Sequence, residues 1–591
     1  MYNMEPSQKQ AQVTSLASIQ QSTAVANVRL MLLCWWFIFS FAAVFQIVLW
    51  PTSDNIACVL LAWMSCIATG VVILRGRVTF LYPWSSLMVL MFCLSTCGFT
   101  LVLMLFQGDP LTFHLEVPVA TFSHLLICQI VLLLIHLGYR NAKIWRRWED
   151  RFRMKVLRPF GLLETPSWPE ALAIGIIGLG ASAYVYIILR DQNEGMLEVT
   201  GSVRDKFVEG LSLLSYAPLP LAFNQLAGRA RKSLIFRLGF VVVYLLPILF
   251  ISMAYNTRIY GFFAFANLGI CLFLLLLSGK MRLHLTKMFI IGFVSFLILS
   301  TIGSDLSIAV RMARDDRAKL SSLNIVKETL QLMTVNRDEL RNLRDVMSQG
   351  KDESEAWYVS SPVFSRLIYT PFQDRALAIA LGLNDGDKDN LRHAEIAFVM
   401  AALPNPVLKI LSDPALGLID RTYEKKENDV AATDIGGYML FLGGNRKQDG
   451  DRSVFRDQNG KLVGDVYAVG GLIGDGFGAY GWGYLIPFGG VAFVLFLFCD
   501  SLYGFSRKPT RENPVWISNF ALVGLVNAYI YAASLTRDSI AELVRFTIRQ
   551  PLQLLVVYGV VFWAVRFVLR ALFGSKTKAL QTRRMVIENP K

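Results

Sequence analysis

The chain has 591 residues, of which 54% are hydrophobic and 17% are charged, and its mean hydropathy is +0.45. Soluble domains carry about a quarter charged residues, so this composition excludes an ordinary soluble protein and indicates a polytopic membrane protein. The net charge is +14, but the basic residues cluster in short loops beside apolar segments. That distribution is typical of residues that orient membrane helices, and it argues against a nucleic-acid partner.

Apolar stretches of roughly 20 residues, enough to cross a hydrocarbon core of about 30 Å, predict twelve membrane spans. The stretch at 208–227 is the weakest, because Pro218 and Pro220 interrupt it. The predicted spans are 30–50, 56–74, 83–106, 118–138, 169–189, 208–227, 238–256, 259–278, 287–304, 481–502, 515–535 and 552–572.

Basic residues lie on every second connection between these spans, so all of the basic loops can face the cytoplasm at once. The expected fold is therefore all-α, with about twelve transmembrane helices and a long, mostly helical extracytoplasmic loop between spans nine and ten. The expected divisions are a cytoplasmic tail (1–29), spans one to nine (30–304), a loop domain (305–480), spans ten to twelve (481–572) and a basic cytoplasmic tail (573–591).

The long polar interruption is far longer than an ordinary connection between helices, and loops of that length are usually functional. Its apolar periodicity predicts helices over 305–320, 321–348, 362–382 and 390–403. The stretch 443–463 is polar and rich in turn residues, which is typical of a mobile loop.

Arginines gather on the face of the membrane that this topology assigns to the interruption, where the positive-inside bias disfavours them. Guanidinium groups bind phosphate oxygens bidentately and can stabilise a diphosphate leaving group, so the pattern predicts a site for a lipid-linked diphosphate. The alternative is that each arginine pairs with a nearby carboxylate or a lipid headgroup. The phosphate-binding candidates are Arg258, Arg311, Arg314, Arg366 and Arg549.

Asp475 and Asp465 are the candidate catalytic carboxylates, because glycosyl transfer needs a group that accepts or orients the proton of the attacking hydroxyl. Asp475 lies between two glycines at a membrane boundary, where an acidic residue is costly unless it is used or paired. Asp374 is a further acidic candidate, and a helix cap or a turn is the structural alternative for all three. The aromatic residues Phe477, Tyr480 and Trp482 could stack on sugars, but an interfacial aromatic belt is the favoured interpretation.

Neither a metal nor a cofactor is expected. The chain has no P-loop, dinucleotide-binding signature, HExxH or GxSxG motif, which argues against nucleotide-driven chemistry. No two of the five histidines have metal-ligand spacing, and the eight cysteines all fall in apolar segments. We therefore expect packing or interfacial roles for the histidines and packing roles for the thiols.

Four strings resemble the O-antigen polymerases, also called oligosaccharide repeat-unit polymerases. They are SDLSIAVRMARDDR, YVSSPVFSRLIYTPFQDRALAIA, GDVYAVGGLIGDGFGAYGWGYLIPFGG and SIAELVRFTIRQPLQLL. The second is similar to the family's "NP…NR…DN" region, with Ser361-Pro362 where Asn-Pro is usual, and the third to its Gly-Asp and aromatic-Gly re-entry.

The resemblance implies a metal-independent, inverting glycosyl transfer on the outer face of a bacterial inner membrane, with both termini cytoplasmic. The donor and acceptor would both be glycans on undecaprenyl pyrophosphate, membrane lipids would surround the protein, and a chain-length regulator would be a further partner. Family arginines that match Arg258, Arg311, Arg366 and Arg549 would bind the pyrophosphates.

Three other functions remain open. A ligase that transfers polysaccharide to a lipid would use the same donor and similar arginines. A transporter or flippase would favour paired halves and charges at mid-membrane, which this chain lacks. A lipid-phosphate-sugar glycosyltransferase expects an acidic motif in the first outer loop, which is here only Pro51-Thr52-Ser53-Asp54.

Overall fold

The computed structural model describes a helical protein, and among the described residues there is no strand. The statements below concern these residues alone. They are 6–74, 83–159, 166–189, 203–227, 233–254, 258–284, 286, 301, 303, 305–306, 308–310, 321–334, 342, 367–400, 471–502, 539–544, 547 and 555–572.

Eight helices in this part of the chain are long and apolar enough to cross a membrane, and each corresponds to one of the twelve predicted spans. They are Ser22–Leu49, Ser53–Ile73, Trp84–Gln107, Pro118–Asn141, Trp168–Ile188, Ile235–Ala254, Leu472–Ser501 and Leu555–Leu572. The predicted spans 208–227 and 259–278 contain the shorter apolar helices Gly210–Phe223 and Phe263–Leu277. The spans predicted at 287–304 and 515–535 lie outside the described residues, apart from 301 and 303.

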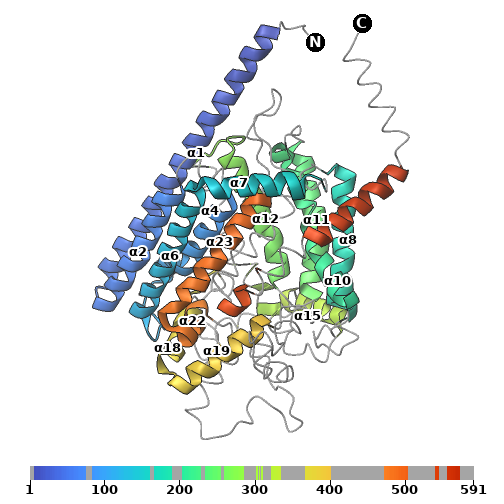
Figure 1. Cartoon of the computed structure of the whole chain (residues 1–591). Coiled ribbons are helices and arrows are strands. Elements are labelled where there is room, and N and C mark those ends of the chain that lie inside the picture. Colours follow the sequence, from blue (N-terminus) through green and yellow to red (C-terminus); the bar gives the residue numbers. More distant parts are fainter. Residues whose placement is uncertain are drawn as a thin grey trace, which may run out of the picture.

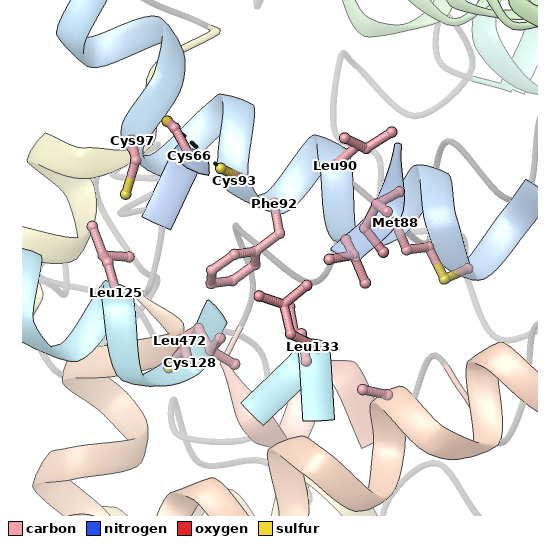
Figure 2. Packing of buried hydrophobic residues seen from close by; sticks show 14 of the residues in the cluster. Cys66, Met88, Leu90, Phe92, Cys93, Cys97, Leu125, Cys128, Leu133 and Leu472 are labelled. Atoms are coloured by element: carbon pink, nitrogen blue, oxygen red, sulfur yellow. Dashed lines mark hydrogen bonds between the residues drawn. The ribbon is translucent and has the colours of Figure 1, made fainter. Parts of the chain in front are cut away.

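The largest apolar core joins the first helices of the chain to a helix near its end. These helices are α1 (Pro6–Leu49), α2 (Ser53–Ile73), α4 (Pro83–Cys93), α5 (Phe99–Gln107), α6 (Pro118–Asn141) and α23 (Leu485–Leu502). Phe92 points from α4 toward α6, and its ring centroid lies 6.0 Å from that of Phe488 on α23 (Figure 2). The thiols of Cys66 and Cys93 lie 3.8 Å apart inside this core, so the packing role expected for these cysteines is confirmed.

A buried carboxylate ties α23 to the beginning of α4. Asp500 accepts hydrogen bonds from the backbone N–H of Trp84 (3.0 Å) and from the Ser85 hydroxyl (2.5 Å). The first N–H groups of a helix have no partner within the helix, so a side chain supplied from elsewhere must satisfy them where water is absent. Asp500 performs this capping role from a position more than 400 residues later in the chain.

The break predicted at Pro218 and Pro220 is present. Helices α8 (Trp168–Ala183), α10 (Val203–Ser212), α11 (Leu234–Ala254) and α12 (Arg258–Leu277) surround two 3-10 segments, Leu213–Tyr216 and Leu219–Ala227. The second segment has a non-helical residue at Phe223.

Buried hydroxyl groups satisfy the polar atoms that this break exposes. The Tyr244 hydroxyl donates to the Ser215 carbonyl oxygen (2.8 Å), and the Tyr260 hydroxyl lies 2.6 Å from those of Ser182 and Ser215. Irregular backbone at membrane depth is tolerated where the protein itself supplies such partners.

The described part of the long interruption consists of helices at one end of the bundle. They are α15 (Ser322–Thr334), α18 (Thr370–Gly382), α19 (Asp385–Met400) and α22 (Leu472–Tyr480). Helix α7 (Lys143–Phe152) lies across the opposite end (Figure 1). The bundle therefore has two chemically different ends.

Two helix starts within the interruption differ from the predicted positions. Helix α18 begins at Thr370, and Pro371 occupies its first turn, where proline is favoured because its missing N–H is not needed. Helix α19 begins at Asp385 because the Asn384 side-chain oxygen accepts a hydrogen bond from the Asp387 N–H (2.8 Å). The sequence pattern predicts a start at 390, which is wrong because Asn384 caps the helix earlier in the chain.

Glycines allow α22 to pack directly on the backbone of α18. A β-carbon added at Gly474 would overlap the backbone of Ala376, and one added at Gly471 would lie 2.7 Å from the Ala376 β-carbon. A β-carbon at Gly478 would lie 3.0 Å from Leu391 on α19. The glycine-rich string therefore forms a helix that touches two neighbours at unusually close range.

We expect Gly474→Ala to destabilise the protein by about 1–3 kcal/mol, because the overlapping atoms belong to backbone that cannot rotate away. The measurement is the thermal unfolding midpoint of the purified full-length protein in detergent. Gly490→Ala is the matched control, since a β-carbon there meets nothing within 4 Å. Equal midpoints for the two variants would contradict the close packing.

Candidate functional site

The candidate site forms where the described helices of the interruption meet the membrane bundle. Helix α18 is seated on a π-helical turn, Leu94–Gly98, between α4 and α5. The Tyr369 N–H donates to the Ser95 carbonyl oxygen (2.9 Å), and the Thr370 hydroxyl donates to that of Thr96 (2.6 Å). A π-turn interrupts the i to i+4 ladder of the helix, so carbonyl groups become available to a partner.

Asp374 fixes α18 against the start of α6. One carboxylate oxygen accepts from the Glu116 N–H (2.5 Å), and the other accepts from the Val117 N–H (3.1 Å) and the Thr121 hydroxyl (2.8 Å). Burial raises the pKa of Asp374, and these three hydrogen bonds oppose that shift. Of the two interpretations of Asp374 in the sequence, these contacts match the helix cap.

Gln373 caps the N-terminus of α22 in the same way. Its side-chain oxygen accepts a hydrogen bond from the Ile473 N–H (2.9 Å), in the first turn of that helix. Helix α18 therefore holds two other helices by their N-terminal ends, through two consecutive side chains. Any group on the first turn of α22 is consequently held in a fixed position.

Asp475 occupies that first turn and is fully buried. A carboxylate at the N-terminus of a helix is favoured by the helix dipole. The neighbouring helix, α19, runs alongside, because Leu391 contacts Gly478 and the Arg392 guanidinium donates to the Ala479 carbonyl oxygen (2.9 Å). One helical turn further along α19 from Leu391 lies Glu395.

Glu395 is the second buried carboxyl group of the site and is only 1% exposed. Burial, followed by the nearby Asp475 carboxylate, raises the pKa of Glu395 well above its ordinary value, while the Tyr480 hydroxyl opposes the shift. Both causes favour the protonated form of Glu395 over the charged form.

The sequence pattern does not single out Glu395 as a candidate site residue. It lies in a helix whose first half is rich in acidic residues, so its charge resembled that of a solvated surface. The usable signal was its spacing of four from Leu391, which places both residues on the face of α19 that is buried.

Aromatic side chains surround His124 of α6 on the other flank of α22. The His124 ring stacks on Trp482 with centroids 4.1 Å apart, and Phe477 meets it edge-on at 4.9 Å. The Tyr484 hydroxyl lies 3.1 Å from His124 Nδ1 and 3.2 Å from the Cys128 thiol. His124 is thus a packed histidine, as expected, and half-exposed Trp482 has one face covered by it.

The structure does not describe the side chain of any of the arginine candidates. Arg258 is the first residue of α12. The other predicted site residues, apart from Asp475, lie outside the described residues: Arg311, Arg314, Arg366, Arg549 and Asp465. Described neighbours of some of them are packed. Ile368, two residues after Arg366, is fully buried, and Ile540, in the segment before Arg549, lies where a β-carbon on Gly476 would contact it at 2.7 Å.

Among the residues that the structure describes, no group of three or more His, Cys, Asp or Glu side chains could hold a metal ion. No family model, curated protein or solved structure matches the chain. The fold and the site together define a helical membrane protein with a buried pair of carboxyl groups at one end of its bundle.

We expect Asp374→Asn to lower the stability of the protein by about 1–3 kcal/mol. An amide has one oxygen where the carboxylate offers two, so its NH₂ group would face an N–H donor at the start of α6. The measurement is again the unfolding midpoint in detergent. The matched control is Asp385→Asn, which is exposed and pairs with Lys388 at 3.5 Å. A midpoint shift no larger than that of the control would argue against the capping role.

The raised pKa of Glu395 predicts a pH-dependent stability. Between the ordinary glutamate pKa and the raised value, the folded protein binds more protons at this residue than the unfolded chain does, so its contribution to stability falls as pH rises. Glu395→Gln should therefore reduce the loss of stability as pH rises from the ordinary glutamate pKa toward the raised one. Unfolding midpoints across this range, with exposed Asp389→Asn as the control, measure the slope. An unchanged slope in Glu395→Gln would show that Glu395 is ionised in the folded state.

Proposed function

We propose that this protein polymerises lipid-linked oligosaccharide repeat units into surface polysaccharide on the outer face of a bacterial inner membrane. The growing glycan is transferred from undecaprenyl pyrophosphate to the sugar of the next lipid-linked unit, with inversion at the donor carbon. The observation that carries the proposal is the burial of Asp475 beside Glu395, at the start of a helix leading into the membrane.

An acidic residue at such a position is costly unless it is used or paired. In the proposed reaction, ionised Asp475 accepts the proton of the acceptor hydroxyl as that oxygen attacks the donor carbon. The bond from this carbon to the pyrophosphate breaks, and the pyrophosphate leaves with the electron pair. Protonated Glu395 keeps the total charge of the pair at a single negative unit, which lessens the cost of burial. Because Asp475 is covered by α18 and α19, we expect α19 to move when the substrates bind.

The arginines Arg258, Arg311, Arg314, Arg366 and Arg549 would bind the two pyrophosphate groups. Their guanidinium charges can stabilise the leaving group, which is why we propose a metal-independent transfer. Support for a position near Asp475 comes from the packed segment before Arg549, where Ile540 lies against the glycine next to Asp475. Asp465 is a second candidate for the proton acceptor, and a chain-length regulator is a further candidate partner.

Asp475→Asn should reduce polymerisation by at least about 100-fold, because the amide cannot accept a proton from the acceptor hydroxyl. Arg258→Ala and Arg311→Ala should also shorten the polymer while leaving the single-repeat glycan intact. The assay is gel banding of surface polysaccharide from the native host lacking its chromosomal copy and expressing each variant. The control is Lys388→Ala, and all variants are checked for equal amounts in the membrane.

The products distinguish the alternatives. Accumulation of long lipid-linked polymer in the Asp475→Asn strain would identify a ligase rather than a polymerase. Transport of a labelled lipid-linked sugar by the purified protein, without polymerisation, would favour a flippase. Unchanged banding in all three variants would refute the proposal.

A further inference from the structure

Helix α7 and the π-helical turn that follows it, Arg153–Leu157, form a surface with three parallel stripes of side chains. Each stripe repeats every four residues. The stripe facing the bundle is Trp145, Glu149, Arg153 and Leu157; the apolar stripe is Ile144, Trp148, Phe152 and Val156; and the basic stripe is Lys143, Arg147, Arg151 and Lys155. We call residues 143–157 the striped helix.

The first stripe holds the striped helix rigidly against the bundle. The Tyr139 hydroxyl of α6 donates to buried Glu149, and the Trp145 ring packs edge-on against Phe493 of α23 at 4.7 Å. The Arg153 guanidinium donates to the carbonyl oxygens of Asp500 (2.6 Å) and Ser501 (3.0 Å) at the end of α23. The other two stripes therefore point in directions set by the bundle.

The apolar stripe is open to its surroundings. Ile144 is 65% exposed and Trp148 40% exposed, and the Trp148 ring stacks on half-buried Phe152 with centroids 5.2 Å apart. Val156 is also exposed. Adjacent to this stripe, all four residues of the basic stripe are exposed.

The π-turn offsets part of the drift of a four-residue repeat around the helix axis. In a regular α-helix of 3.6 residues per turn, every step of four residues drifts around the axis. The wider turn, closed by a hydrogen bond from the Arg158 N–H to the Arg153 carbonyl oxygen (2.8 Å), rotates the next residues back. Lys155 and Val156, which lie within this turn, are both exposed.

The position of the striped helix matches the surface of a membrane. It lies across the ends of α6 and α23 (Figure 1), directly after Asn141 ends α6 and beside the point where α23 ends. A helix with an apolar stripe beside a basic one, held at the level where membrane spans end, lies in the plane of the lipid headgroups.

We propose that the striped helix binds anionic phospholipid headgroups, with its apolar stripe inserted among the upper acyl chains and its basic stripe on the phosphates. Charge complementarity selects this occupant: four exposed cations recur at every fourth residue, beside apolar side chains that need a non-aqueous neighbour. The inference does not depend on the proposed function.

The first test measures lipid selectivity with the full-length protein in neutral detergent. Phosphatidylglycerol or phosphatidylcholine is titrated in, and the unfolding midpoint is followed. We expect phosphatidylglycerol to raise the midpoint more, and Arg147→Gln/Arg151→Gln to need at least about ten times more of it for half of the effect. Raised salt should weaken the selectivity, because exposed charges are screened.

The matched control is Lys327→Gln/Lys388→Gln, which removes the same charge from an exposed side chain on α15 and a partly exposed one on α19, at the other end of the bundle. It should respond to phosphatidylglycerol as the unchanged protein does. The proposal is overturned if the two double variants behave alike. It is also overturned if Arg147→Gln/Arg151→Gln changes the oligomeric state without changing the response to lipid, since the surface would then be an interface between copies.

A second measurement tests depth and does not rely on stability. A fluorophore is attached at Ile144→Cys or Arg147→Cys in a Cys34→Ser background, which removes the one partly exposed native thiol among the described cysteines. In phospholipid nanodiscs, the label at 144 should be quenched by a lipid-borne quencher and the label at 147 by aqueous iodide. Equal quenching of both labels by iodide would place the apolar stripe in water and refute insertion.

Discussion

Helix N-termini that begin away from water are the physical constraint on which this fold depends. Two of them are satisfied by buried aspartates from distant parts of the chain. Asp500 caps α4 and Asp374 caps α6, each through at least two hydrogen bonds. A missing partner at such a position costs several kcal/mol in an apolar medium. The late helices are therefore required for the early ones to begin where they do.

The same arrangement connects the loop to the membrane bundle. On α18, Asp374 accepts hydrogen bonds from N–H groups at the start of α6, and Gln373 accepts one at the start of α22. Helix α18 itself donates hydrogen bonds to carbonyl groups of the π-turn between α4 and α5. The first turn of α22, which carries Asp475, is thus positioned from outside its own helix. A polar group that must act at the edge of a bilayer gains preorganisation from such support.

The sequence was sufficient to predict most of the membrane-crossing helices and the interrupted helix at Pro218, because both depend on local composition. It was not sufficient for the contacts of Asp374, whose partners lie more than 250 residues away. The string Gly474-Asp475-Gly476 predicts a catalytic carboxylate at a membrane boundary. Its glycines are instead explained by packing, since Gly474 touches the backbone of α18 and Gly476 touches Ile540.

Glu395 is a site residue that the sequence pattern does not reveal. Its chemical character depends on being covered and on a second carboxylate supplied by another helix, and neither condition is visible in the charged sequence around it. The expected helix at 390–403 was right in kind, but its start was late because the cap at Asn384 was missed. Single side chains that end or begin helices are weaker signals than apolar periodicity.

The π-turn at Leu94–Gly98 has a consequence for how this protein tolerates change. The oxygens of the turn that accept hydrogen bonds from the start of α18 belong to the main chain. They are available because the helix contains one extra residue at this point, not because of any particular side chain. Many substitutions within the turn would preserve these backbone acceptors. Deletion of one residue would instead restore the regular α-helical hydrogen bonds, and the carbonyl groups would no longer be available to α18. At this place, the number of residues carries more information than their identity.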